Sequence, residues 1–573
     1  MEMVDHDIII IGGGAAGLRA AIAAAEAGNR TGKPPSIAII SKVYPVRSHT
    51  VAAEGGAAAV LREYDNQDSH IQDTIRGSDY LADQDVVEAF VHEAPGEIVR
   101  LEHWGCPWSR EPDGRLAARA FGGMSVKRTF FAADKTGFHL LHTLFQTLLK
   151  FPAIIRYDEW FVTSLVVHEG KVRGVVALEL RTGSLRMVTA RAVVLATGGC
   201  GRVFPFTTNG AINTGDGMAL AYRAGAALKD MEFVQYHPTG LPGLGILITE
   251  ASRGEGGYLL NRHGERFLER YVPTRMELGP RDLISRAIIT ELEEGRGFGG
   301  PKDGYVHLDV RHLGTSTLEE RLPFVLELAR TYAGIDPVSQ PIPVRPVVHY
   351  MMGGVHTDLE GQTSLEGLYA CGETACVTIN GANRLGSNSL SECLVFGTRA
   401  GKAAVAYAKE QAPVEQRTLL AQGQDEAQRI EKRFQRQSDQ GERVSDLRKD
   451  LQLTMEESAG VYRTEEGIVQ GKEKLKELRE RFCRVRLKDT TQTFNVELVG
   501  ALELDFMLDV AETIIYSALK RRESRGAHAR RDFPQRNDNE YLFHAKVRHT
   551  LEGPSLAPTP VTITRWQPAE RKY

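Results

Sequence analysis

The sequence predicts an α/β fold: a doubly wound domain that is interrupted by an inserted α+β domain and followed by a helical domain and a short C-terminal domain. Three observations carry this prediction. The chain opens with a strand, a glycine-rich turn, a helix and a second strand; glycine-dense sequence returns near residue 345; and a stretch rich in Glu, Gln, Lys and Arg follows residue 410. The 573 residues suffice for several domains, because one domain commonly takes ~150 residues.

The first element is a buried strand that ends in a glycine-rich turn. Residues 8–11 are isoleucines, alanine-rich residues 18–27 predict a helix, and residues 36–41 predict a second strand. A G-x-G-x-x-G turn lets backbone approach a pyrophosphate, and the helix behind it offers N–H groups and the positive end of its dipole to the phosphates. We therefore predict a Rossmann-like dinucleotide site. Its turn residues are Gly12, Gly13, Gly14, Ala15 and Gly17.

The end of the second strand bears on which dinucleotide binds. Nicotinamide sites usually carry an acidic residue there, which binds a ribose hydroxyl. This sequence has Ser41 and Lys42 instead. The difference disfavours a nicotinamide cofactor and leaves FAD open.

The later elements follow in order. Residues 191–197 predict a strand before a second Gly-Gly turn, and beyond about Gly240 the sequence changes to loops and short helices. Residues 417–486 predict amphipathic helices in a bundle, residues 506–520 another helix, and residues 561–564 a short strand. The predicted domains are 1–240 and 345–410 for the two parts of the cofactor domain, 241–344 for the insertion, 411–525 for the helical domain and 526–573 for the C-terminal domain.

Composition excludes several classes of function. The 70 basic and 74 acidic residues give a net charge of -4, and no basic block with interleaved aromatics occurs, so we expect no nucleic-acid partner. The 6 cysteines form no CxxC pair, so we expect no metal or iron–sulfur site within the chain. So few cysteines indicate a reducing compartment. The acidic start lacks the basic region of a signal peptide, and no apolar run approaches the ~20 residues that span a bilayer.

A run of residues after the second strand points to a known family. Residues 47–56, Arg-Ser-His-Thr-Val-Ala-Ala-Glu-Gly-Gly, resemble the flavin-attachment motif of the flavoprotein subunits of succinate dehydrogenases and fumarate reductases. The resemblance covers nearly the whole chain. Its further motifs are Gln235-Tyr-His237-Pro-Thr-Gly, Thr249-Glu250, Arg253-Gly-Glu-Gly-Gly, Gly279-Pro-Arg281-Asp, His349-Tyr, Cys371-Gly-Glu373, Asn383-Arg384-Leu-Gly-Ser-Asn-Ser389-Leu and Arg522-Glu-Ser-Arg-Gly-Ala-His528.

The resemblance implies an FAD-binding domain that is interrupted by a capping domain. It also implies that the FAD is bonded covalently, through its 8α-methyl group, to His49. A neutral imidazole suits this bond because it is a good nucleophile. Further flavin contacts that the resemblance implies are Ser41, Lys42, Ser48, Thr50, Gly55, Gly56, Asp216, Glu373, Ser389 and Leu390.

The same resemblance implies a site for a four-carbon dicarboxylate. Arginine suits two carboxylates because its planar fork binds a carboxylate through two hydrogen bonds. The implied substrate contacts are His237, Thr249, Arg281, His349 and Arg384. Arg281 is implied as the proton donor or acceptor, in a relay with Glu250 and Arg253; since arginine rarely deprotonates in proteins, it can serve only as a transient member of that relay.

We therefore expect the catalytic subunit of a succinate:quinone or quinol:fumarate oxidoreductase. Electrons would leave through a separate iron–sulfur subunit, and membrane anchor subunits with a quinone site would hold the chain at the cytoplasmic face of the cell membrane. A soluble FAD-dependent dicarboxylate or L-aspartate oxidase of the same fold is the alternative, and a flavoprotein acting on RNA is disfavoured by the net charge. Glu54 resembles the fumarate-reductase branch, but the direction of the reaction and the role of residues 522–528 stay open.

Overall fold

The computed structural model describes the chain except residues 31, 33, 301–302, 413–415, 435–440 and 573. At its centre lies a five-stranded sheet in which every neighbouring pair is parallel. The strands at Ile8–Ile11 and Ile37–Ser41 are neighbours in this sheet, as the predicted βαβ unit requires. In spatial order the strands are β18 (Leu368–Ala370), β11 (Ala192–Leu195), β2 (Ile8–Ile11), β3 (Ile37–Ser41) and β7 (Ile154–Asp158).

The isoleucines of β2 face both sides of this sheet. Ile8 and Ile10 pack among helices on one face, whereas Ile9 and Ile11 pack on the other face against a second, four-stranded sheet. This alternation explains why the strand is apolar throughout. The helices are α1 (Ala15–Asn29), α2 (Gln67–Gly77), α3 (Gln84–His103), α4 (Thr136–Leu148) and α11 (Asn388–Glu410). The second sheet consists of β1 (Glu2–Asp5), β10 (Ser184–Thr189), β9 (Lys171–Glu179) and β8 (Trp160–His168).

Two glycines of α11 bring it close to α1. A Cβ at Gly401 would lie 2.2 Å from the Ala20 carbonyl oxygen, and one at Gly397 would lie 2.8 Å from the Ala16 oxygen. The second cofactor-domain segment therefore packs directly on the helix behind the glycine-rich turn. A three-stranded sheet of β4 (Ala57–Ala58), β6 (Thr129–Phe130) and β5 (Ala118–Arg119) lies in the same part of the chain.

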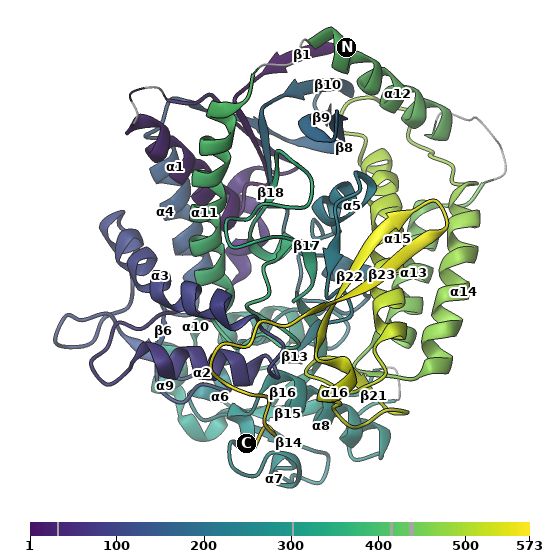
Figure 1. The fold of residues 1–573 in the computed structure, drawn as a ribbon. Coiled ribbons are helices and arrows are strands. Elements are labelled where there is room, and N and C mark those ends of the chain that lie inside the picture. Colours follow the sequence, from purple (N-terminus) through teal and green to yellow (C-terminus); the bar gives the residue numbers. More distant parts are fainter. Residues whose placement is uncertain (31, 33, 301–302, 413–415, 435–440, 573) are drawn as a thin grey trace.

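The inserted segment forms its own hydrophobic core under a four-stranded antiparallel sheet. This part of the molecule lies at the bottom of Figure 1, next to α2 and the C-terminal segment. Its strands are β13 (Val234–Gly240), β16 (Ile342–Met351), β15 (Val306–Asp309) and β14 (Tyr258–Leu260). Its helices are α6 (Ala251–Gly254), α7 (Leu268–Tyr271), α8 (Arg281–Glu293), α9 (Thr315–Arg321) and α10 (Pro323–Leu328).

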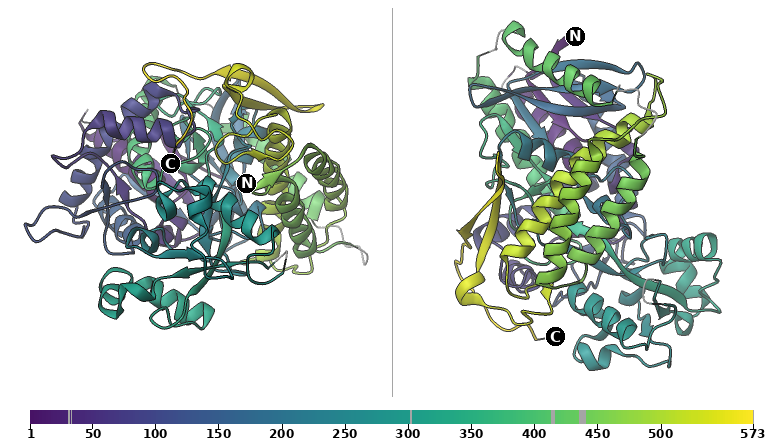
Figure 2. Two further views of the ribbon diagram at one scale, coloured as in Figure 1. Left: turned by 90° about the horizontal axis from the view of Figure 1, so that it is seen from below. Right: turned by 90° about the vertical axis from the view of Figure 1, so that its right-hand side faces the viewer.

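The helical segment differs in one respect from the predicted bundle. Helices α13 (Val444–Ala459), α14 (Glu465–Phe482) and α15 (Val496–Lys520) run side by side, as Figure 2 shows. Helix α12 (Gln416–Phe434), however, packs mainly on β8 and β10, where Leu419 enters a small core, and only its C-terminal end reaches the bundle, through Phe434 against Phe482 of α14. The prediction of one bundle for residues 417–486 was wrong for most of α12, because Leu419 on its apolar face is buried against Val166 of β8 and Met187 of β10. Residues 435–440 of that stretch lie outside the described part.

The C-terminal segment adds a hairpin rather than the predicted strand at 561–564. Strands β22 (Phe543–Thr550) and β23 (Gly553–Pro560) pair, and the chain is irregular beyond them. Residues 562–566 bond instead to the start of α3: the Thr562 N–H donates to Asp83, and the Gln84 side-chain amide donates to the Trp566 carbonyl. The prolines of β23 are tolerated because it is an edge strand. The hairpin joins β19 (Ala375–Cys376), β17 (Gly354–His356) and β12 (Leu228–Lys229) in one five-stranded sheet. The remaining short α-helices and strands are α5 (Asp216–Arg223), β20 (Tyr462–Arg463), β21 (Ala529–Arg530) and α16 (Asp538–Tyr541).

Candidate active site

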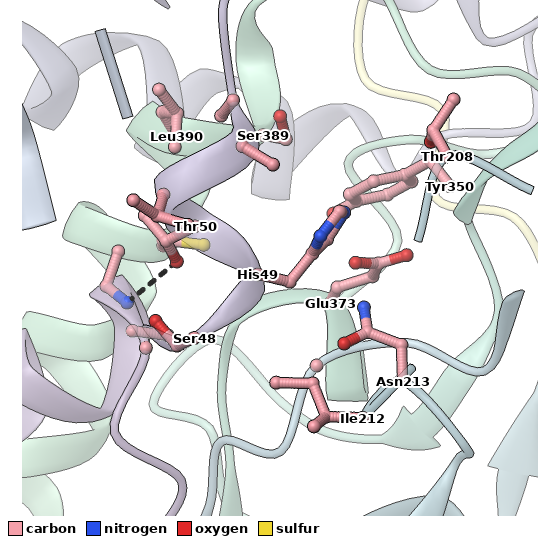
Figure 3. A pocket seen from close by; sticks show the side chains of 18 of the residues that line it. Ser48, His49, Thr50, Thr208, Ile212, Asn213, Tyr350, Glu373, Ser389 and Leu390 are labelled. Atoms are coloured by element: carbon pink, nitrogen blue, oxygen red, sulfur yellow. Dashed lines mark hydrogen bonds between the residues drawn. The ribbon is translucent and has the colours of Figure 1, made fainter. Parts of the chain in front are cut away.

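A cavity of about 810 Å³ lies where the two parts of the cofactor domain meet the inserted segment. That volume is in the range of ligand and cofactor pockets. All of the predicted flavin and substrate contacts line it except Gly17, and of the predicted relay only Arg253 does not reach it. Figure 3 shows side chains from several separate segments pointing into this space, among them His49, Glu373 and Asn213. The fold therefore brings together nearly all of the predicted site residues.

The glycine-rich turn forms one wall. Gly12 has a φ of +116°, and a Cβ there would lie 2.2 Å from the Ala196 oxygen. Gly17 faces inward, since a Cβ would lie 2.0 Å from the Gly12 oxygen, so its role is to let α1 approach the turn. Helix α1 begins at Ala15 with neither a capping side chain nor an acidic residue in its first turn. Its N-terminus is thus suited to a pyrophosphate.

The end of β3 carries a buried charge cluster. Lys42 Nζ lies 2.7 Å from Asp216, 2.8 Å from Glu503 of α15 and 2.9 Å from the Thr214 hydroxyl. Burial would lower the pKa of Lys42, but the two carboxylates outweigh it and raise that pKa. Glu503 was not predicted, since nothing in the sequence links residues so far apart. Through it the helical segment contacts the cofactor end of the cavity.

Three further residues on this wall fit a flavin nucleotide. The Thr50 hydroxyl accepts a hydrogen bond from the Ala15 N–H at 3.1 Å, drawn in Figure 3. The Ser48 hydroxyl is buried and makes no hydrogen bond with any described residue. Burial raises the pKa of Glu373 to about 7. A buried unbonded hydroxyl and a desolvated carboxyl are groups that a polyhydroxylated ligand would satisfy. The donors and the cradle therefore fit FAD.

His49 lies between this wall and the other end of the cavity. It belongs to the short helix η2 (His49–Ala52), and its Nδ1 accepts the Gly210 N–H at 3.2 Å. Burial, and then the positive charge of Arg202, lower the pKa of His49 to about 4. The imidazole is therefore neutral at physiological pH, with Nδ1 occupied by the backbone.

Two neutral histidines line the opposite end. The His237 and His349 rings have centroids 5.0 Å apart. Burial, and then the charge of Arg281, hold the pKa of both well below 6.5. His237 Nδ1 accepts the Thr239 N–H at 3.2 Å, and His349 Nδ1 lies 2.8 Å from the Thr208 hydroxyl. Thr208 was not predicted.

Two buried arginines face these histidines and share one partner. Arg281 and Arg384 both donate to Gln235 Oε1, at 3.0 and 3.2 Å. Burial, and then the charge of Arg281, lower the pKa of Arg384 to about 10. Arg384 also donates to the Ser389 hydroxyl at 2.8 Å. Gln235 opens the Gln-Tyr-His-Pro-Thr-Gly motif but was not predicted as a site residue; its position two residues before His237 on one strand was the available signal.

The predicted relay residues form a contiguous set. The Glu250 carboxylate accepts a hydrogen bond from Arg281 Nε–H at 2.8 Å and another from the Gly122 N–H at 2.6 Å. Arg253, behind Glu250, lies 3.5 Å from it and is 2% exposed. Burial would raise the pKa of Glu250, but Arg281 and Arg253 outweigh it and lower that pKa. Thr249, which is 1% exposed, precedes Glu250 in the chain and lines the cavity.

Neither a membrane-spanning helix nor a metal site occurs among the described residues. Among the described residues, no helix combines the length and apolar character that a membrane crossing needs. Within the same part of the chain, no group of three or more His, Cys, Asp or Glu side chains is placed to hold a metal ion.

Comparisons with known proteins agree with this geometry. Residues 7–390 match the FAD binding domain family, and residues 448–573 match the fumarate reductase flavoprotein C-terminal family. The chain is 58% identical to a fumarate reductase flavoprotein subunit of Mycobacterium tuberculosis over 99% of both chains, and 44% identical to a succinate dehydrogenase flavoprotein subunit of Rickettsia bellii over 99% of this chain and 98% of that one. A solved Escherichia coli quinol fumarate reductase chain superimposes with a TM-score of 0.97 at 49% identity, covering 100% of this chain and 99% of that one.

These matches confirm the predicted fold class and the FAD-binding domain. The exact domain boundaries stay a prediction. With both family matches and relatives of this identity along its full length, the chain belongs to the family of fumarate reductase and succinate dehydrogenase flavoprotein subunits.

Proposed function

We propose that this FAD-dependent oxidoreductase interconverts succinate and fumarate in the cavity described above. One observation carries the substrate assignment: two buried arginines, joined by one glutamine oxygen, face two neutral histidines. Two positive charges with convergent donors match a ligand that carries two carboxylates. The relatives are named fumarate reductase or succinate dehydrogenase subunits, which favours this reaction over a soluble aspartate oxidase. Glu54 resembles the fumarate-reductase branch, and the physiological direction stays open.

The residues divide the work as follows. Arg384, His237, His349 and Thr249 bind and orient the two carboxylates, while the N-terminus of α1 and the cluster around Lys42 hold the dinucleotide. When bound, FAD supplies the two-electron chemistry as a hydride donor or acceptor for one central carbon of the dicarboxylate. The isoleucine and leucine at 246–247 help to exclude water from the same space.

Arg281 holds or moves the proton at the other central carbon. Arg281 Nε is already bonded to Glu250, which in turn lies beside Arg253. A guanidinium releases its proton only transiently. Because Glu250 is hydrogen-bonded to Arg281 Nε, it offers a path along which a proton can return to the guanidinium after that release.

We infer that FAD is held covalently through His49 Nε2. Its low pKa keeps the imidazole neutral and hence nucleophilic. The Gly210 N–H occupies Nδ1, so the neutral ring carries its hydrogen on Nε2, and Nε2 must release that proton as it forms the bond. A ring substituted at Nε2 keeps on Nδ1 the lone pair that Gly210 requires.

We further propose that electrons pass to an iron–sulfur subunit and then to membrane anchor subunits with a quinone site. A structural relative is a quinol fumarate reductase, and another is described with menaquinol. A peripheral position at the cytoplasmic face of the cell membrane agrees with the few cysteines and their reducing compartment.

His49→Ala tests the covalent assignment. Wild-type protein should keep its flavin through acid precipitation and show a fluorescent band on a denaturing gel, whereas the variant should bind flavin but release it in acid. Succinate oxidation should fall more than fumarate reduction, because loss of the bond lowers the flavin potential. Release of all flavin from wild-type protein would refute the linkage, and oxygen-dependent turnover of L-aspartate without succinate oxidation would favour the oxidase.

A further inference from the structure

One short segment, residues 207–210, holds the active-site histidine His349 in place. Thr208 and Val348 bond through their backbones, since the Thr208 N–H donates to the Val348 carbonyl at 2.9 Å. The Asn209 side chain donates to the His349 carbonyl at 2.9 Å. The Thr208 hydroxyl lies 2.8 Å from His349 Nδ1. Backbone and side chain of His349 are thus both fixed by this segment.

The direction of the bond between Thr208 and His349 decides what the ring offers to a ligand. A neutral imidazole carries one N–H and one lone pair, and a hydroxyl can donate or accept. If the hydroxyl donates to Nδ1, then Nε2 carries the hydrogen. If it accepts from Nδ1, then Nε2 presents a lone pair, which would repel a carboxylate.

Two observations favour the hydroxyl as the donor. It makes no other hydrogen bond with a described residue, so its hydrogen has no competing acceptor in that part of the chain. The neighbouring His237 shows the same arrangement in a form that cannot be reversed, because the Thr239 backbone N–H can only donate to His237 Nδ1. Both rings then present Nε2–H to the same space.

We propose that Thr208 is a positioning residue that fixes His349 as the tautomer with its hydrogen on Nε2, so that the ring can donate to a substrate carboxylate. The inference rests on the proposed dicarboxylate function. Thr208 acts through His349 and takes no part in proton transfer. The Thr208 hydroxyl affects the substrate only through the His349 ring. The same segment also donates to His49, through the Gly210 N–H.

Thr208→Val removes the hydroxyl and keeps the shape of the side chain. Malonate, an unreactive dicarboxylate, should bind the flavin-loaded full chain about tenfold to hundredfold more weakly by titration calorimetry, the effect of losing one hydrogen bond to a charged group. The KM for fumarate should rise by a similar factor while kcat changes less, because a binding contact is lost. Thr208→Ser should stay within about threefold of wild type, since it keeps the donor.

A spectroscopic signature separates positioning from a general loss of structure. In protein labelled with 15N-histidine, the His349 resonances, assigned with His349→Gln, should report hydrogen on Nε2 in wild type and in Thr208→Ser. Thr208→Val should show a mixture of tautomers. The matched control is Thr454→Val, because Thr454 is buried in α13 and, among the described residues, its hydroxyl bonds only to the Asp450 carbonyl of its own helix; it should bind malonate like wild type.

The outcomes distinguish this inference from the proposed function. If wild-type protein binds no malonate, the dicarboxylate function fails first. If wild type binds malonate and Thr208→Val binds it equally well with an unchanged tautomer, the role of Thr208 is refuted. Equal losses in Thr208→Ser and Thr208→Val would refute it too. Should Thr208→Val fail to fold, Thr208→Ala tests the same loss of the hydroxyl.

Discussion

At the scale of single residues, one amide side chain resolves the main electrostatic problem of the site. Two arginines so close together in a buried cavity repel each other, and the lowered pKa of Arg384 reflects burial and then this repulsion. Gln235, 0% exposed, offers one oxygen to both and donates its own amide to Asn383 and to the Arg384 carbonyl. A glutamate there would neutralise the charge that a dicarboxylate needs. A neutral acceptor holds both guanidinium groups in place and leaves their charge available to the ligand.

Arg281→Gln and Arg281→Lys test the proton step. Both substitutions should lower the turnover rate in either direction by ~10²–10⁴-fold, which is usual when a general acid is lost. Lysine should preserve substrate binding better than glutamine because it keeps the charge. The measurement is a stopped-flow half-reaction in which pre-reduced enzyme is mixed with fumarate and flavin reoxidation is followed. Reoxidation of Arg281→Gln at the wild-type rate under saturating fumarate would exclude Arg281 as the acid and direct attention to Glu250, His237 or His349.

The site residues that the sequence revealed were those in local motifs. The glycine turn and the run around His49 are each contiguous, so their geometry follows from a few neighbouring residues. Gln235 shares a strand with His237, and its contribution was accessible from strand alternation. Thr208 and Glu503 were not accessible, because their partners His349 and Lys42 are 141 and 461 residues away. Only the three-dimensional structure reveals such contacts.

At the scale of elements, the residues around 522–528 gain a structural role. Gly526, with a φ of +52°, donates its N–H to Asp79 at 2.8 Å, and its carbonyl accepts Arg286 of α8 at 2.9 Å. The Ala527 N–H donates to the Ala382 carbonyl at 2.8 Å. This C-terminal loop therefore contacts both the helix that begins at Arg281 and the turn that carries Arg384. It positions the two arginines relative to each other.

Gly526→Ala should disturb that contact. A Cβ there would lie 2.4 Å from the Ala382 oxygen, in a backbone conformation that side chains rarely adopt. We expect the turn at Ala382 to shift and the KM for fumarate to rise at least ~10-fold, a loss of ~1.4 kcal/mol or more. Steady-state kinetics measures this effect. Gly334→Ala is the control, since Gly334 has a φ of +66° but no atom within 4 Å of an added Cβ; an equal loss in the control would show that backbone strain alone is responsible.

Element types followed from the sequence more readily than their partners. The isoleucine strand and the alanine-rich helix formed where periodicity and composition predicted them, and the long helix predicted for residues 506–520 ends as predicted but begins earlier, at Val496. Helix α12 has an amphipathic pattern like that of its neighbours, yet it packs on a sheet. Residues 561–564 have β-branched side chains, but the Thr562 N–H donates to Asp83 instead of to a neighbouring strand. Periodicity gives the face of an element that is buried and leaves open the surface that buries it.

At the scale of the whole molecule, a buried ion cluster fastens the C-terminal hairpin to the cofactor domain. His544 of β22, 0% exposed, lies with Nδ1 2.6 Å from Asp230 and Nε2 3.2 Å from Asp83. Lys229 lies 3.8 Å from Asp83, and His356 is a further titratable neighbour. Burial would lower the pKa of His544, but Asp230 and then Asp83 outweigh it and raise that pKa. The charged imidazole, with each ring nitrogen next to one carboxylate, offsets the negative charges of Asp83 and Asp230, which come from two distant segments.

This cluster should make stability depend on pH in a defined direction. A histidine whose pKa is raised in the folded state stabilises fully below its unfolded pKa of ~6.5, and that contribution disappears as pH rises through the folded value. The pKa of Asp83 is lowered: burial would raise it, but His544 and Lys229 outweigh burial. Its contribution is present above its unfolded pKa of ~3.9 and is lost as pH falls toward the folded value. Together the cluster should stabilise the fold most between about pH 4 and 6.5.

His544→Gln tests this argument, because glutamine keeps hydrogen-bonding capacity but cannot carry the charge. Removing one member of a buried ion cluster commonly costs ~3–5 kcal/mol, since the carboxylates stay buried without their partner. The urea midpoint of unfolding, followed by circular dichroism at pH 5.5 and at pH 8.5, should fall in the variant at both values. The difference from wild type should be larger at pH 5.5, where wild-type His544 is fully charged in both states. A difference that is the same at both pH values would mean that His544 contributes through packing and neutral hydrogen bonds rather than through its charge.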